Sequence, residues 1–148
     1  MSVIKEIFSN TIFISAIVGW SLAQFIKIFL GVVREKKFNF KWLIETGGLP
    51  SAHASGMCAL ATSVGLEEGF SSPIFAISLV LALITMFDAQ TVRRSVGEQA
   101  EILNKMLDDL YWKRKIGEDK IKEFWGHTPL EVLIGAIMGV LIGLIVSS

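Results

Sequence analysis

The sequence is poor in cysteine and carries no net charge. A single cysteine, Cys58, excludes an internal disulfide framework and a cysteine-rich metal site. The 14 basic residues balance the 14 acidic ones, which excludes a strongly basic nucleic-acid binder. A hydrophobic content of 52% excludes intrinsic disorder. A chain of 148 residues normally forms one domain, so we treat residues 1–148 as a single unit.

Charged side chains are missing from four long stretches, which are residues 7–26, 46–66, 69–87 and 132–148. A bilayer core needs about 20 apolar residues, and too little polar surface remains to cover four such stretches in a soluble core. The sequence therefore predicts an all-α fold, an integral membrane bundle. We expect a retained first helix, not a cleaved signal peptide, and spans at about 12–33, 51–66, 71–88 and 129–147.

The basic residues predict the orientation in the membrane. Twelve of the 14 lie in the connections after the first and third expected spans, and none lies in the second connection. The positive-inside rule places both basic connections in the cytoplasm and both termini outside. We therefore expect a multi-pass protein of the plasma membrane.

The third connection has helical periodicity of its own. Its apolar residues recur at helical spacing, and Glu101 and Lys105 are placed as an i,i+4 ion pair on the other side. Ser95 with Glu98 matches a capping box that would begin the helix. We expect a cytoplasmic amphipathic helix over about 95–112, on the membrane surface or packed on the bundle.

The second span opens with Gly47-Gly48-Leu49-Pro50-Ser51-Ala52-His53. Ser51 is a suitable N-cap, so the sequence is compatible with a simple capped helix start. The free backbone N–H groups of such a start also attract phosphate. Both interpretations stay open on this motif alone.

Cations gather at the same end of the expected bundle. Arg93 and Arg94 follow the third span, where paired arginines act as topology anchors or grip phosphate oxygens. Lys27 interrupts the first apolar stretch near its end. A lysine there points to a protein-lined cavity or extends to the headgroups.

The fourth span opens with Gly126-His127-Thr128-Pro129-Leu130-Glu131. Thr128 and Glu131 match a capping box, which is the structural interpretation of Glu131. His127 and Glu131 are also four residues apart, where a carboxylate can orient an imidazole. With four spans, the start of the second span, the end of the third and the start of the fourth all lie at the cytoplasmic end. Both histidines of the chain belong to that end.

These motifs resemble a known superfamily. Pro50-Ser51-Ala52-His53 and His127-x-x-x-Glu131-Val132-x-x-Gly135 are similar to motifs of type 2 phosphatidic acid phosphatases and vanadium haloperoxidases. Together with Phe87-Asp88-Ala89, Val92-Arg93-Arg94 and Gly97-Glu98-Gln99-Ala100, they resemble the short divergent bacterial and plant branch of that superfamily. The likeness runs from about Gln24 to Gly143.

The resemblance implies a phosphatase that uses no metal or other cofactor. By position, His127 would attack phosphorus, Glu131 would orient it in place of the usual aspartate, and His53 would act as general acid and base. Ser51 and nearby backbone N–H groups, including that of Gly48, would bind the phosphate oxygens.

The sequence departs from the superfamily pattern in its phosphate-binding half. Ala52 replaces the motif glycine, the Lys-x6-Arg-Pro motif is absent, and Ile121 stands where an arginine is expected. Lys27 or Lys41 could replace the lysine, and Arg93 or Arg94 the arginines.

Small residues indicate close helix packing. Gly135, Gly139 and Gly143 form overlapping G-x-x-x-G patterns, and Ala52, Gly56 and Ala59 offer a small face on the second span. Either face suits a neighbouring helix of the bundle or a second copy, and we expect a homo-oligomer through the three glycines.

The leading hypothesis is a membrane phosphatase acting on a lipid phosphate monoester, of the phosphatidate or phosphatidylglycerol phosphate type, at the cytoplasmic face. The alternative is a non-catalytic phospholipid-binding or transport protein that retains the phosphate pocket. A vanadate-dependent haloperoxidase fits poorly with four charge-free stretches.

Overall fold

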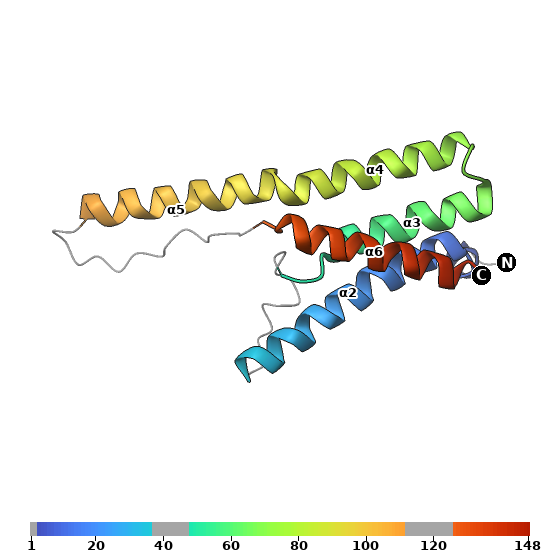
Figure 1. Cartoon of the computed structure of the whole chain (residues 1–148), viewed down its shortest axis with the longest axis horizontal. Helices are drawn as coiled ribbons and strands as arrows, with labels where there is room; N and C mark the ends of the chain where they lie inside the picture. Colours follow the sequence, from blue (N-terminus) through green and yellow to red (C-terminus); the bar gives the residue numbers. More distant parts are fainter. Residues whose placement is uncertain (1–2, 37–47, 112–125) are drawn as a thin grey trace.

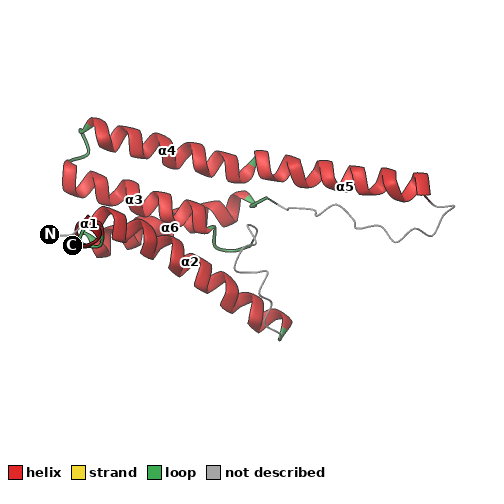
Figure 2. Cartoon of the chain, turned by 180° about the vertical axis from the view of Figure 1, so that it is seen from behind, coloured by secondary structure: helices red, strands yellow, loops and turns green. Residues whose placement is uncertain are grey.

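A computed structural model of the chain describes residues 3–36, 48–111 and 126–148, without the side chains of 92–94 and 107–111. The described residues form helices and no strand (Figure 1, Figure 2), which confirms the expected all-helical class. In chain order the helices are α1 (Val3–Ile7), α2 (Thr11–Glu35), α3 (Ala52–Glu68), α4 (Pro73–Gln90), α5 (Val92–Tyr111) and α6 (Pro129–Val146).

Side-chain caps begin four of these helices. Asn10, Ser51, Ser72 and Thr128 each accept a hydrogen bond from the backbone N–H three residues later, at α2, α3, α4 and α6. Pro73 and Pro129 occupy the first positions of α4 and α6, where a backbone donor is not needed. The bounds of the long apolar helices therefore follow from local sequence signals.

Helix α3 is the centre of the bundle. It packs against α2, α4 and α6, and most of its side chains are small. Ser55 and Ala59 are wholly buried, and the Ser55 hydroxyl donates to the Gly19 carbonyl of α2 at 2.8 Å. Small side chains let three neighbours approach one helix from different sides.

The glycines of α6 face α3. A Cβ atom at Gly135 would meet the Ser51 carbonyl oxygen, one at Gly139 the Ser55 carbonyl oxygen, and one at Gly143 would lie 2.7 Å from the Thr62 Cβ. These glycines thus pack inside the bundle, because α3 of the same chain covers their face. A second copy would have to pack against another surface.

Hydroxyl groups join three helices at the end of the bundle that holds both termini (Figure 1). Ser63 of α3 contacts Ser15 of α2 at 3.1 Å and also bonds to Ser147, which follows α6. All three bonded groups are hydroxyls that can donate as well as accept. The three helices are thus joined opposite the end where α5 leaves the bundle.

Three helical segments within the described residues are long and apolar enough to cross a membrane. They are Thr11–Glu35, Pro73–Met106 and Pro129–Val146. The second of these includes α4 and the first part of α5. Helix α3, with 17 residues, is not among them.

Helix α5 begins earlier than the sequence predicts. Its first residue is Val92, and the Ser95 N–H donates to the Thr91 carbonyl at 2.9 Å, so the prediction of a Ser95 N-cap is wrong. The break between α4 and α5 is a single residue, Thr91, and α5 continues the line of α4 beyond the bundle (Figure 1). The expected pair of Lys105 with Glu101 is present at 2.6 Å.

Candidate functional site

Backbone hydrogen bonds join three helix ends at one end of the bundle. The Ser51 N–H, before α3, donates to the Glu131 carbonyl of α6 at 3.1 Å. The His127 N–H, before α6, donates to the Ala89 carbonyl in the last turn of α4 at 3.1 Å. The start of α3, the end of α4 and the start of α6 therefore meet, as the topology predicts.

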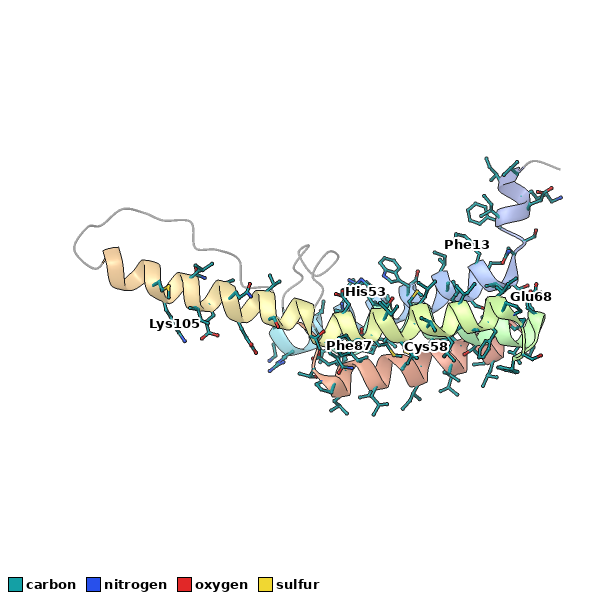
Figure 3. All side chains as sticks on the ribbon, turned by 90° about the horizontal axis from the view of Figure 1, so that it is seen from above. Phe13, His53, Cys58, Glu68, Phe87 and Lys105 are labelled. Carbon is teal, nitrogen blue, oxygen red and sulfur yellow. The ribbon has the colours of Figure 1, made fainter. Side chains whose placement is uncertain are left out.

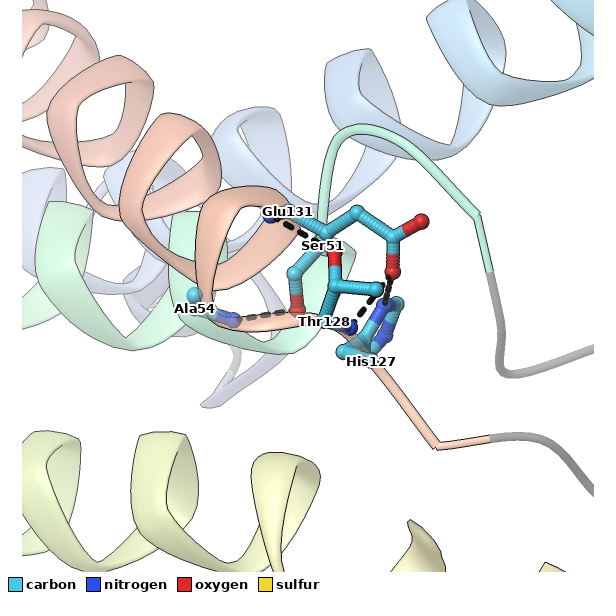
Figure 4. Close-up of polar contacts among 5 residues, drawn as sticks. All are labelled: Ser51, Ala54, His127, Thr128 and Glu131. Atoms are coloured by element: carbon cyan, nitrogen blue, oxygen red, sulfur yellow. Dashed lines mark hydrogen bonds and ion pairs between the residues drawn. The ribbon is translucent and has the colours of Figure 1, made fainter.

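His127 is buried at this junction. Only 1% of the residue is exposed to solvent, and its Nε2 atom is inaccessible to solvent as well. Its Nδ1 lies 3.2 Å from the Glu131 Oε2, and the Glu131 side chain keeps 21% exposure (Figure 4). With the ring proton on Nδ1, the imidazole donates to the carboxylate and carries its lone pair on Nε2.

Glu131 has both of the roles that the sequence suggested. Its Oε2 also accepts from the Thr128 N–H at 3.0 Å, and the Thr128 Oγ1 accepts from the Glu131 N–H at 3.4 Å. This reciprocal pair is a capping box. One carboxylate oxygen therefore caps α6 and contacts the imidazole (Figure 4).

Ser51 lies beside this pair as the N-cap of α3. It is wholly buried, and its hydroxyl accepts from the Ala54 N–H at 3.4 Å. The N-termini of α3 and α6 thus lie together, each with a capping hydroxyl. Two helix N-termini raise the local positive potential, which favours an anion at their meeting point.

Gly48 and Lys27 are neighbours in the structure. Gly48 has φ of +99°, and a Cβ there would lie 3.4 Å from the Lys27 Cγ. The left-handed conformation favours glycine at this position. The lysine of α2 therefore approaches the segment that leads into Ser51.

His53 lies on the first turn of α3, two residues after Ser51, and is partly buried. It occupies the end of the bundle from which α5 departs (Figure 3). Arg93 and Arg94 lie in the first turn of α5, and their side chains are outside the described part. Lys41 lies outside the described residues.

Within 3–36, 48–111 and 126–148, no group of three His, Cys, Asp or Glu residues could hold a metal ion. The groups that do converge are an imidazole with a carboxylate on Nδ1, a buried hydroxyl and two helix N-termini. This combination suits nucleophilic attack by nitrogen on a bound anion.

One contact at the site has no signal in the sequence. The Ala89 carbonyl fixes the backbone of His127, and a main-chain acceptor is present at every residue whatever its side chain. The Phe87-Asp88-Ala89 segment resembles a motif of the family. Nothing in its side chains identifies the Ala89 oxygen as the partner of His127.

Comparison with known proteins identifies relatives but no structural precedent. The model of the Divergent PAP2 family matches residues 8–142. The uncharacterized membrane protein YuiD of Bacillus subtilis (strain 168) is 36% identical over 155 residues, which cover 96% of this chain and 97% of that protein. No solved structure matches the chain. The chain therefore belongs to the divergent PAP2 family, named for type 2 phosphatidic acid phosphatases, as the resemblance of its motifs implied.

Proposed function

We propose that this membrane protein is a metal-independent phosphatase that hydrolyses a lipid phosphate monoester, of the phosphatidate or phosphatidylglycerol phosphate type. The observation that carries the proposal is the buried His127 with Glu131 on its Nδ1, placed where the N-termini of α3 and α6 meet. Family membership supports the same reaction class.

In the proposed first step, the His127 Nε2 attacks phosphorus and the bond from phosphorus to the alkoxide oxygen breaks. His53 gives its proton to that oxygen, and the lipid alcohol leaves. In the second step, His53 takes a proton from water as the water oxygen attacks the phosphohistidine. The phosphorus–nitrogen bond breaks, inorganic phosphate leaves, and both histidines regain their initial states.

The phosphate oxygens are assigned to groups around the junction. Ser51, the backbone N–H of Gly48 and the free N–H groups of α3 face the anion in this proposal. Lys27, whose side-chain stem lies near Gly48, supplies positive charge from α2. The remaining cations proposed for phosphate binding are Lys41, Arg93 and Arg94.

Access to the nucleophile requires movement in this mechanism. The His127 side chain is fully buried, so a phosphate reaches Nε2 only after the surrounding residues separate. A dry site strengthens the attraction between the phosphate and nearby N–H groups once the lipid is bound.

Release of inorganic phosphate tests the proposal directly. Purified protein in mixed micelles with excess chelator is expected to release phosphate from at least one of phosphatidate, phosphatidylglycerol phosphate and a polyprenyl phosphate. A micelle lacking protein and one containing denatured protein are the controls. Absence of release from every lipid, with and without added divalent cations, would contradict the proposed activity.

We further propose that α3 crosses the membrane as a fourth span. Its 17 residues extend about 25 Å at 1.5 Å per residue, close to the thickness of the hydrocarbon core. Its small and polar residues are covered by α2, α4 and α6, so lipid does not contact them. The site then faces the cytoplasm of the cell and both termini face outward.

Cysteine labelling checks this topology, because Cys58→Ala leaves a chain without cysteine. On that background, Glu67→Cys at the exposed C-terminal end of α3 is expected to react with a membrane-impermeant maleimide added outside intact cells. Lys105→Cys on α5 is expected to react only after the membrane is opened. Reaction of both cysteines from the same side would exclude the four-span arrangement.

A second candidate is a non-catalytic phospholipid-binding or transport protein. The complete burial of His127 favours it, since a pocket that does not turn over needs no exposed nucleophile. Binding of a lipid phosphate that survives His127→Ala, together with no phosphate release by the parent protein, would identify this function. Loss of both binding and release in the variant would argue against it.

A further inference from the structure

The position and the orientation of His127 depend on different contacts. The backbone is fixed by the hydrogen bond from its N–H to the Ala89 carbonyl at 3.1 Å. That bond fixes the main chain but does not set the side-chain torsions of the ring. The contact from Nδ1 to the Glu131 Oε2 at 3.2 Å orients the ring. The orientation of the imidazole therefore depends in part on this carboxylate.

Thr128 forms hydrogen bonds with both the side chain and the main chain of Glu131. The Thr128 N–H donates to Oε2 at 3.0 Å, and the Thr128 hydroxyl accepts from the Glu131 N–H at 3.4 Å. Oε2 is the same oxygen that contacts His127. Thr128 itself is exposed, and the contacts that Figure 4 draws for it are with Glu131 and not with the imidazole.

Without this capping box, Glu131 would have two ways to leave the imidazole. The side chain has three rotatable bonds, and part of it is exposed, so water can replace the imidazole as a hydrogen-bond partner. The first turn of α6 could also fray, because its N–H groups have no helical acceptors. The main-chain N–H of Thr128 restrains the carboxylate, and the Thr128 hydroxyl restrains the first turn of α6.

We propose that Thr128 is a positioning residue for the nucleophile. Through the capping box it holds the Glu131 Oε2 against Nδ1, keeps the ring proton on Nδ1 and leaves the Nε2 lone pair for attack. The kinetic consequence rests on the proposed function, whereas the orientation of the ring does not.

Kinetics with matched variants test the catalytic part. Thr128→Val keeps the shape and the N–H bond to Oε2 but removes the hydroxyl that accepts from the Glu131 N–H, and kcat is expected to fall on the order of tenfold to 100-fold with little change in KM. Thr128→Ser restores the acceptor and is expected to restore kcat. Ser72→Ala removes the N-cap of α4, which accepts from Phe75 at 3.2 Å. It is expected to lower thermal stability but leave kcat unchanged. Equal losses in Thr128→Val and Ser72→Ala would overturn the proposal.

A spectroscopic readout needs no turnover. The chain has two histidines, so ¹⁵N-histidine labelling gives two imidazoles, and His53→Gln assigns the one from His127. Glu131→Ala supplies the spectrum of an unoriented ring. We expect protonation on Nδ1 in the parent protein and a shift toward the Glu131→Ala spectrum in Thr128→Val. No shift would overturn the positioning role, whereas a shift in a protein that releases no phosphate would overturn only the proposed activity.

Discussion

Replacement of His127 by alanine is expected to abolish phosphate release, because the variant lacks the nitrogen that forms the bond to phosphorus. The side chain is fully buried beside Glu131, so its removal also leaves a carboxylate without the contact at 3.2 Å. In the micelle assay, phosphate release by the variant should fall to the detection limit. Acid-labile, base-stable labelling by a ³²P lipid phosphate should be present in the parent protein and absent in the variant.

His53 supplies the matched comparison for this result. As a general acid, it is needed for a poor leaving group such as a lipid alkoxide, so His53→Gln should lose activity on the order of 10²- to 10⁴-fold. An aryl phosphate has a good leaving group and should recover much of that loss in His53→Gln but none in His127→Ala. Recovery in both variants, or retained activity in His127→Ala, would show that His127 is not the nucleophile.

Gly135→Ala, which adds a methyl group, is expected to have the largest effect among changes in the helix packing that also disturb the site. A Cβ there would overlap the Ser51 carbonyl oxygen and approach the Ser51 Cβ to 3.1 Å. The obstacle is backbone, so α3 and α6 must move apart. We expect Gly135→Ala to lower the free energy of unfolding by about 1–3 kcal/mol, the usual effect of overpacking.

This separation should also reduce phosphate release, because the Ser51 N–H donates to the Glu131 carbonyl across the same contact. The measurement is thermal unfolding in detergent together with the phosphate assay. Val140→Ile adds one methylene to an exposed position of α6 and should change neither quantity. A Gly135→Ala protein as stable as the parent would contradict the close packing of α3 and α6.

The helices were predictable because charge is excluded from the membrane interior. Gaps between charged residues and the capping residues Ser51 and Thr128 located the apolar helices within a few residues of their bounds. The start of α5 was mispredicted because the capping signal at Ser95 is local, whereas the helix already begins at Val92. Only the three-dimensional path of the chain shows that α5 extends from α4.

The site was predictable in its side chains but not in its contacts. A shared helical face indicated the pairing of His127 with Glu131, and a lysine in an apolar stretch singled out Lys27. The sequence could not show that Lys27 lies against Gly48, because two segments far apart in the chain meet there. It offered a choice between two roles for Glu131, whereas the geometry combines them.

The double role of Glu131 constrains how this position can change in evolution. An aspartate is one methylene shorter, and a glutamate or glutamine is the residue that completes a capping box at this position. A change from glutamate to aspartate would therefore have to be accompanied by a different start for α6. We expect glutamate here to vary together with the hydroxyl at position 128 among relatives, as one inherited unit.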